Sequence, residues 1–185
     1  KMGVWARNYH FVTNVLWLED SEPMQSYEPL PLPELKVPHN LLIEPYDYQK
    51  EGIAYALDKK RCILGDEQGL GKTIEAIGLL TATRAFPALV ICPASLKINW
   101  QRELRKFGGL NSVILDDKNR ATWQRFWTLK RSDGKPCAEV FIVNYESLRK
   151  FFVQSIKREG RFTLKSVEFD ERKDMFRTII IDESH

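Results

Sequence analysis

A short apolar run followed by glycines and then Lys-Thr is the feature that most restricts what this chain can fold into. The run Cys62–Leu64 is short enough for a buried strand, and Gly69 and Gly71 lead through Lys72 into a helix-forming segment. Glycine adopts backbone dihedrals closed to other residues, and a helix that begins near Lys72 adds the positive end of its dipole. A strand, a glycine turn and a helix N-terminus in this order predict a cradle for phosphate groups.

The side chains of this turn fit the same interpretation. Main-chain N–H groups of the turn can approach phosphate oxygens, the lysine can reach the outer phosphates, and the threonine can ligate Mg²⁺. The predicted nucleotide-binding residues are Gly69, Leu70, Gly71, Lys72 and Thr73. One position departs from the usual pattern, because Asp66 stands where the first glycine is expected. Taken alone, the stretch could therefore also be an ordinary strand-to-helix turn.

Composition places the chain among intracellular globular proteins. Its 185 residues suit one domain, and 43% hydrophobic with 29% charged residues is typical of such a domain. No apolar run approaches the roughly 20 residues of a membrane span, and the N-terminus lacks the pattern of a secretory signal. We therefore expect a protein of the cytoplasm, nucleoid or nucleus that is neither secreted nor a membrane protein.

Cysteine spacing and net charge exclude some other classes. Cys62, Cys92 and Cys137 are widely spaced, so they predict neither a zinc site nor a disulfide framework. The net charge of +3 is the small difference between 28 basic and 25 acidic residues. This balance does not by itself indicate a nucleic-acid partner.

The N-terminal part of the chain differs from the rest. Residues 1–22 contain two aromatic and β-branched runs that predict a small accessory β-hairpin. Its aromatic side chains could form a base-stacking platform, although simple packing is the more common role. Residues 23–40 form a proline-rich linker, since prolines recur at positions 23, 29, 31, 33 and 38.

From residue 41 onwards, apolar runs alternate with helix-forming segments. Strands are predicted at 62–64, 88–92, 113–115, 140–143 and 178–181, and helices at 49–57, 73–83, 96–107, 119–129 and 145–157. Ser95 is a candidate cap for the third helix, which Gly108-Gly109 would end. Residues 161–171 interrupt the rhythm and suggest an inserted hairpin within an excursion over 158–175. The alternation predicts an α/β fold with a parallel sheet covered by helices on both faces.

A second motif follows the last predicted strand. Asp182 and Glu183 come directly after the apolar run 178–181. A carboxylate at a strand end can hold Mg²⁺, and the next one can orient or deprotonate a water molecule beside a terminal phosphate. Acidic pairs also commonly end strands at a solvated edge. The combination with the phosphate loop is what favours a nucleotide-hydrolysing site in which Lys72, Asp182 and Glu183 are catalytic.

Three segments together resemble one protein family. Residues 66–73, residues 89–100 and the DEAH-like box Asp182-Glu183-Ser184-His185 look like motifs I, Ia and II of the Swi/Snf-type helicase-like ATPases. The resemblance covers about residues 41–185 and includes Asp66 in place of the first glycine. It implies a RecA-like P-loop NTPase lobe, the first of two lobes in a superfamily-two DNA translocase that uses ATP and Mg²⁺.

The resemblance also implies roles for further residues. Gln49 corresponds to the adenine-reading glutamine, although Asp47 stands where the family usually has proline. The positions that correspond to the DNA path in this family are Pro93, Ala94, Ser95, Asn144 and Tyr145. Ser95 could instead be only a helix cap, and Asn144-Tyr145 only a turn. Basic residues after Ser95 and the pair Arg149-Lys150 could contact phosphates or simply face solvent.

The implied function is a DNA-dependent ATPase that moves along duplex DNA. The sequence ends after motif II, so we expect these residues alone to bind ATP weakly and to hydrolyse it poorly without the second RecA-like lobe. Duplex DNA and that lobe are the expected partners, while the oligomeric state is not indicated. A strand-separating helicase, a restriction-type motor and a non-hydrolysing nucleotide-dependent DNA-binding module remain alternatives. Intact Lys72, Thr73, Asp182 and Glu183 disfavour the last of these.

Overall fold

The computed structural model of the protein describes residues 38–66, 69–156 and 167–183. The chain divides after Thr83 into two compact units. The predicted accessory hairpin at 1–22 and most of the linker at 23–40 lie outside the described residues. None of the described helices is long and apolar enough to cross a bilayer.

The described residues of the first unit form two helices, α3 (Asp47–Lys59) and α4 (Lys72–Thr83). Asp47 in the first turn of α3 and Lys59 in its last turn complement the helix dipole. The two helices pack closely at Gly78, where a Cβ atom would lie 2.3 Å from Ile53 Cδ1. Both helices were predicted, and α3 extends two residues beyond its expected bounds at each end.

The strand predicted at 62–64 is not formed. Residues 62–66 have no regular secondary structure, and Ile63 is 44% exposed. A strand is stable only when its backbone groups pair with a neighbouring strand. Within residues 38–66 and 69–83 the structure contains no strand that could serve as that neighbour.

The second unit is built on a four-stranded parallel sheet with strand order β2-β3-β1-β6. Its strands are β1 (Ala88–Cys92), β2 (Ser112–Ile114), β3 (Val140–Asn144) and β6 (Thr178–Ile181). Every residue of β1 and β3 is buried, as their continuous apolar runs predict. Strand β6 lies at the edge of this sheet, and its residues Ile179 and Ile181 are exposed although the sequence predicted a buried strand.

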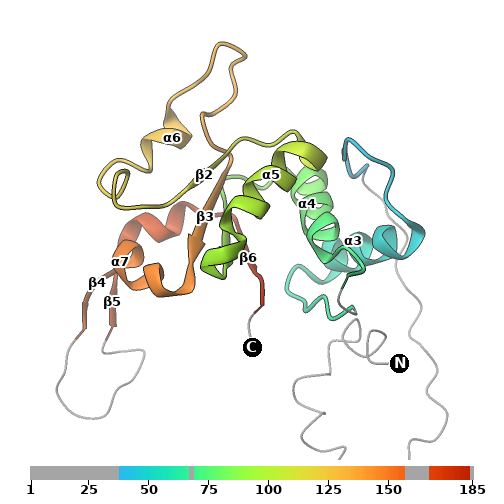
Figure 1. The fold of residues 1–185 in the computed structure, drawn as a ribbon, viewed down its shortest axis with the longest axis horizontal. Helices are drawn as coiled ribbons and strands as arrows, with labels where there is room; N and C mark the ends of the chain where they lie inside the picture. The colour runs from blue at the N-terminus through green and yellow to red at the C-terminus, as the bar shows by residue number, and fades with distance from the viewer. Residues whose placement is uncertain (1–37, 67–68, 157–166, 184–185) are drawn as a thin grey trace, which may run out of the picture. The chain divides into compact units, whose positions relative to one another are not determined.

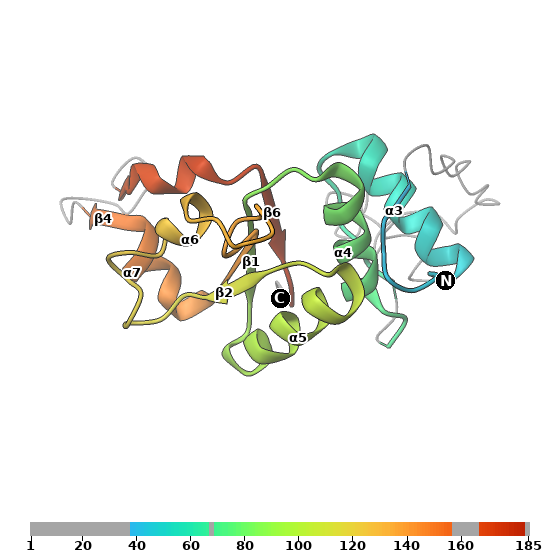
Figure 2. The same cartoon turned by 90° about the horizontal axis from the view of Figure 1, so that it is seen from above.

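Helical segments cover both faces of this sheet (Figures 1 and 2). The 3₁₀ turn η2 (Ala94–Leu96) and helix α5 (Lys97–Gly108) lie on one side. Helix α6 (Arg125–Thr128) and the 3₁₀ segment η5 (Glu171–Met175) lie on the other. The predicted α/β architecture is therefore confirmed.

The side opposite α5 holds an aromatic core. Trp123 is fully buried, stacks on Phe176 with ring centroids 5.6 Å apart, and meets Phe141 and Phe152 edge to face. Leu89, Ile91 and Val143 complete this side of the sheet. Trp123 therefore lies at the centre of the core on this side of the sheet.

The helix predicted at 119–129 is almost entirely absent. Only α6 is helical there, and residues 117–124 form turns. Asp116 Oδ1 accepts hydrogen bonds from the backbone N–H groups of Lys118 and Asn119, and Asn119 Nδ2 donates to the carbonyl of Ile114. These side chains satisfy backbone groups locally and compete with a helix.

The helix predicted at 145–157 is also shorter than expected. It consists of the 3₁₀ turn η3 (Tyr145–Ser147) and helix α7 (Leu148–Phe152), after which the chain becomes strand β4 (Val153–Ile156). Strand β4 pairs antiparallel with β5 (Val167–Phe169), so the inserted hairpin contributes β5 while its partner strand lies earlier than expected. A β-branched residue at each end of β4 favours the strand once this partner is present.

Candidate functional site

The loop before α4 has the backbone that the glycine pattern predicts. Gly69 and Gly71 have φ values of 89° and 81°, in the region that side chains disfavour. At Gly71 a Cβ atom would also lie 2.6 Å from Gln49 Nε2, whereas the space around Gly69 is open. Gly71 is therefore required both for its backbone conformation and for the close approach of Gln49. Residues 67 and 68 of this loop lie outside the described residues.

Lys72 and Thr73 open helix α4, as predicted. The ammonium group of Lys72 donates a hydrogen bond of 2.8 Å to the carbonyl of Asp66, which lies in the loop itself. The first N–H groups of a helix have no intrahelical acceptors, so anions are favoured at this end. A lysine ammonium, two glycines with positive φ and a helix N-terminus at one place fit the phosphates of a nucleotide.

Gln49 links α3 to this loop. It is 2% exposed, its Oε1 accepts a hydrogen bond from the backbone N–H of Tyr46 at 3.0 Å, and its Nε2 donates to the carbonyl of Leu70 at 3.0 Å. Tyr48 donates its hydroxyl to the same carbonyl at 3.1 Å. The amide thus caps the helix and holds the loop, and an amide has a second N–H and a second oxygen lone pair for further hydrogen bonds. The adenine role of Gln49 stays a prediction.

In the second unit, the segments that follow β1, β3 and β6 meet at one edge of the sheet, because parallel strands end on the same side. The backbone N–H of Asp182 donates to the carbonyl of Ile91 at 2.9 Å, which keeps Asp182 beside the end of β1. The hydroxyl of Tyr145 donates to the carbonyl of Asp182 at 2.6 Å. The predicted Mg²⁺ ligand and a predicted DNA-path residue are therefore in direct contact.

The side-chain carboxylate of Asp182 also has a partner, which the sequence did not reveal. The indole N–H of Trp100 donates to Asp182 Oδ2 at 2.8 Å, and Trp100 is only 3% exposed. In the sequence, Trp100 belongs to the segment 89–100, and no contact was predicted for it. A buried indole N–H usually has an acceptor, and that tendency was the available signal.

The geometry fits a metal site in which the protein supplies few ligands and phosphates and water supply the others. Among the described residues no cluster of three or more His, Cys, Asp or Glu side chains could hold a metal ion. Mg²⁺ in nucleotide sites is usually held by one or two carboxylates together with phosphates and water. Asp182 is half-buried, and its Oδ1 remains beside the oriented Oδ2, so the residue suits that kind of coordination.

Burial and the charge of Asp182 set the protonation of two neighbours. Burial, and then the charge of Asp182, raise the pKa of Tyr145, so its hydroxyl stays protonated and remains a donor at neutral pH. The same two causes raise the pKa of Cys92 to about 11. Both side chains therefore stay uncharged beside the carboxylate at neutral pH.

Asn144 is held from two directions. Lys97 Nζ donates to Asn144 Oδ1 at 3.1 Å, and Asn144 Nδ2 donates to Glu146 Oε2 at 2.6 Å. The hydrogen bond from Asn144 lowers the pKa of Glu146. Asn144 is 8% exposed, so its side chain positions Lys97 and Glu146 at the surface rather than presenting itself there.

Ser95 does not cap a helix. It lies within η2, while Pro93 and Leu96 hold the cap positions of η2 and α5 without side-chain hydrogen bonds. The cap interpretation was wrong because η2 precedes α5 and moves the helix start past Ser95. Ser95 and Ala94 are exposed, and Pro93 is half-buried.

Glu183 is exposed and has a φ of 53°, a conformation that is uncommon outside glycine and asparagine. The chain therefore turns sharply just after the strand that carries Asp182. Ser184 and His185 of the DEAH-like box lie outside the described residues.

Comparison with known proteins identifies the family. The sequence profile of the SNF2-related domain matches residues 15–185. The chain belongs to the SNF2-related domain family. Its SNF2-type fold is also seen in a solved structure, the Sulfolobus solfataricus SWI2/SNF2 ATPase core in complex with dsDNA, with a TM-score of 0.52 and 27% identity over 80% of this chain and 28% of that one.

Curated SNF2 relatives are much longer than the chain. The "SWI/SNF-related matrix-associated actin-dependent regulator of chromatin subfamily A-like protein 1 homolog" of Caenorhabditis elegans is 31% identical over 143 residues, which cover 76% of this chain and 17% of the relative. "Protein CHROMATIN REMODELING 19" of Arabidopsis thaliana is 33% identical over 174 residues, which cover 90% and 20%. The chain thus spans a fifth or less of these relatives.

Proposed function

We propose that the chain is the first ATPase lobe of a motor that hydrolyses ATP to move along duplex DNA. The observation that carries this proposal is the hydrogen bond from the Tyr145 hydroxyl to the carbonyl of Asp182. It joins the residue expected to bind Mg²⁺ to a segment expected to lie along DNA. A change at one residue therefore reaches the other through a single contact.

The nucleotide chemistry is assigned to residues at the two motifs. MgATP, when bound, supplies the phosphoryl group that is transferred to water. Lys72 would neutralise charge on the outer phosphates, and Thr73 and Asp182 would hold Mg²⁺. Glu183 orients the attacking water and takes its proton. The exposed position of Glu183 supports this role, since the residue must reach a water molecule.

DNA is assigned to the carboxyl edge of the sheet in the second unit. The solved Sulfolobus solfataricus SWI2/SNF2 ATPase core is in complex with dsDNA. The exposed hydroxyl residue Ser95 and the ammonium group of Lys97, which Asn144 positions, supply polar and cationic groups for phosphates. Exposed Ala94 and half-buried Pro93 lie beside them in the chain. A neighbouring hollow of about 370 Å³ is lined by further basic side chains, namely Arg120, Arg149 and Lys150. Such contacts give affinity without sequence preference, as a motor requires.

We further propose that efficient turnover requires a second RecA-like lobe. In related phosphoryl-transfer enzymes an arginine from a partner element accelerates hydrolysis by a factor on the order of 10³ or more. Residues 41–185 resemble only the first lobe. These residues alone are therefore expected to turn ATP over slowly even when DNA is present.

The test is ATPase activity of the complete polypeptide with duplex DNA, single-stranded DNA or no DNA, together with displacement of a third strand from a DNA triplex. Stimulation by duplex and triplex displacement are expected, and both should be lost in Lys72→Ala and Glu183→Gln. Arg125→Glu, an exposed substitution outside both motifs, is the matched control and should retain both activities.

Three outcomes contradict the proposal in different ways. Stimulation only by single strands, or separation of a forked duplex without triplex displacement, indicates a strand-separating helicase. Nucleotide-dependent DNA binding without turnover indicates a module that does not hydrolyse ATP. Retention of turnover in Glu183→Gln refutes only the role of Glu183 and leaves the rest of the proposal standing.

A further inference from the structure

A hollow lies at the amino ends of the strands, at the edge of the sheet opposite Asp182. Pro87, Glu139 and Arg177 directly precede β1, β3 and β6, and all three line this hollow. Its volume is about 530 Å³, within the roughly 300–1,000 Å³ of ligand pockets. Since parallel strands place their amino and carboxyl ends on opposite edges, this hollow is separate from the edge assigned to DNA.

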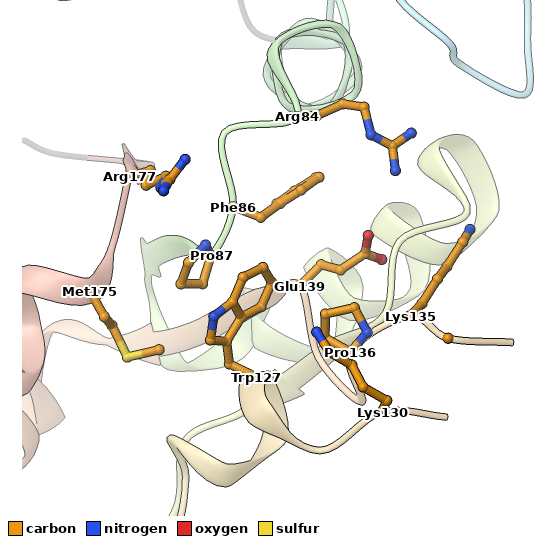
Figure 3. Close-up of a pocket in the computed structure, with 11 residues that line it drawn as sticks. Arg84, Phe86, Pro87, Trp127, Lys130, Lys135, Pro136, Glu139, Met175 and Arg177 are labelled. Carbon is orange, nitrogen blue, oxygen red and sulfur yellow. The ribbon is translucent and has the colours of Figure 1, made fainter. Parts of the chain in front are cut away.

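The hollow has an apolar interior. Phe86 and Pro87 are buried, and the rings of Trp127 and Pro136 and the side chain of Met175 are partly exposed towards the cavity. Figure 3 shows the rings of Phe86, Pro87 and Trp127 grouped in the middle of the site. Apolar surface of this kind favours an aromatic or large aliphatic group of a partner.

The rim of the hollow is strongly cationic. It carries four exposed basic side chains, Arg84, Lys130, Lys135 and Arg177. Figure 3 shows Arg177 on one side of the central rings and Arg84 and Lys135 on the other. Within the part of the chain that the structure describes, none of the four forms an ion pair, and Lys130 lies over the Trp127 ring at 5.1 Å.

One carboxylate lines the hollow, and it already accepts a hydrogen bond from the protein backbone. Glu139 is 4% exposed, and its Oε2 accepts a hydrogen bond from the backbone N–H of Asn111 at 3.2 Å. Its charge is too little to balance the four cations of the rim. An anionic partner therefore gains favourable electrostatic interactions from several directions at once.

We propose that this hollow binds an acidic segment of a partner protein that inserts an aromatic or large aliphatic side chain between Phe86 and Trp127. The acidic residues flanking that side chain pair with Arg84, Lys135 and Arg177. Duplex DNA is a poorer occupant, because it keeps its bases stacked inside and presents only phosphates and sugars to the apolar interior. A peptide supplies both the charge and the apolar group.

The test measures binding to the complete polypeptide of a fluorescein-labelled peptide in which one tryptophan is flanked by glutamates. Fluorescence anisotropy should show saturable binding that weakens as NaCl is raised, since rim charges are screened. The double substitution Lys135→Glu with Arg177→Glu should weaken binding about tenfold or more. Both residues are exposed, so folding is expected to be retained. Arg125→Glu, an exposed charge reversal outside the hollow, should change binding less than about twofold.

Two further peptides and one competitor make the test decisive. Replacing the tryptophan by serine, or the glutamates by glutamines, should each abolish most of the binding. Absence of saturable binding, or equal binding to the double variant, overturns the proposal. So does competition by duplex DNA together with loss of DNA affinity in the double variant, because the hollow is then a nucleic-acid site. The peptide measurement needs neither ATP nor turnover, so it is independent of the motor function.

Discussion

Trp100 Nε1 lies 2.8 Å from Asp182 Oδ2 and donates a hydrogen bond to it. A buried aromatic residue of α5 thereby orients the carboxylate at the end of β6. Residues that orient a metal-binding carboxylate typically affect metal affinity or activity by about 10–100-fold. If Asp182 holds Mg²⁺ as proposed, Trp100 is a positioning residue whose effect is measurable through the Mg²⁺ dependence of activity.

Trp100→Phe should weaken the response to Mg²⁺ while leaving the fold intact. Phenylalanine keeps most of the buried apolar surface but removes the N–H donor. We expect the Mg²⁺ concentration for half-maximal ATPase activity to rise about tenfold. Trp123→Phe is the control, because the buried Trp123 Nε1 has no hydrogen-bond partner among the described residues. An unchanged Mg²⁺ response in Trp100→Phe would show that the contact does not position the ligand.

Tyr145→Phe should reduce the coupling between DNA and hydrolysis. The substitution removes the hydroxyl that donates to the carbonyl of Asp182 and keeps the ring. We expect basal ATPase activity within about twofold of wild type and a several-fold smaller stimulation by duplex DNA, consistent with the loss of one coupling contact. Activity with and without DNA at saturating MgATP checks this. An equal loss of both activities would indicate a purely structural role.

Gly71→Ala should abolish nucleotide binding with a moderate loss of stability. Alanine is strained at a φ of 81°, and its Cβ would lie 2.6 Å from Gln49 Nε2. Gly134→Ala is the matched control, because Gly134 has a φ of 76° but open space around it. The control should lose about 1 kcal/mol of stability from the backbone alone and bind ATP normally. Calorimetric titration with ATP and urea unfolding distinguish the two effects.

Gly78→Ala should destabilise the first unit although alanine is the better helix former by about 1 kcal/mol. Its Cβ would lie 2.3 Å from Ile53 Cδ1, so α3 and α4 must separate or Ile53 must move. We expect a net loss of roughly 1–2 kcal/mol in urea unfolding. Ile53→Val removes the contacting methyl group, and the double variant should be more stable than the sum of the single effects. Simple additivity would argue against the close packing.

Cys92 should resist alkylation in the folded protein. Its pKa of about 11 reduces the thiolate at pH 8 by about a hundredfold relative to an ordinary cysteine, and the side chain is fully buried. Because the pKa is raised, the thiol form is favoured by folding, and thiolate appears only as the pH rises towards 11. Mass spectrometry after brief iodoacetamide treatment should show Cys137 labelled before Cys92. Equal labelling rates in folded protein would contradict the burial of Cys92.

Continuous apolar runs predicted the strands of the sheet in the second unit reliably, whereas the run at 62–64 in the first unit forms no strand. They predicted β1 and β6 at their observed bounds and β3 within one residue, because a strand of a covered parallel sheet can be apolar on both faces. Gly109 ends α5 in the left-handed conformation, as the Gly108-Gly109 pair predicted. The glycine turn at 69–71 was predictable for the same reason, since few other residues adopt its backbone.

Other features depended on partners that the sequence does not place. Periodicity favoured a helix at 119–129, but the local hydrogen bonds of Asp116 and Asn119 replaced it with turns. Strand β4 forms because β5 pairs with it from beyond residue 166. The same limit hid the hydrogen bond between Trp100 and Asp182, which are 82 positions apart. Nothing in the local sequence around Trp100 indicates which residue accepts the hydrogen bond of its indole N–H.

Tyr145 is held by the backbone of Asp182, not by its side chain, and this has a genetic consequence. Asp182→Asn removes the negative charge, yet the carbonyl that receives the tyrosine hydroxyl and an oxygen for the Trp100 indole both remain. We expect such an allele to produce a protein that is folded, occupies its DNA and cannot complete a cycle. In a cell that also carries the wild-type allele, the bound variant would block access of the wild-type protein to DNA. The mutation would therefore be dominant.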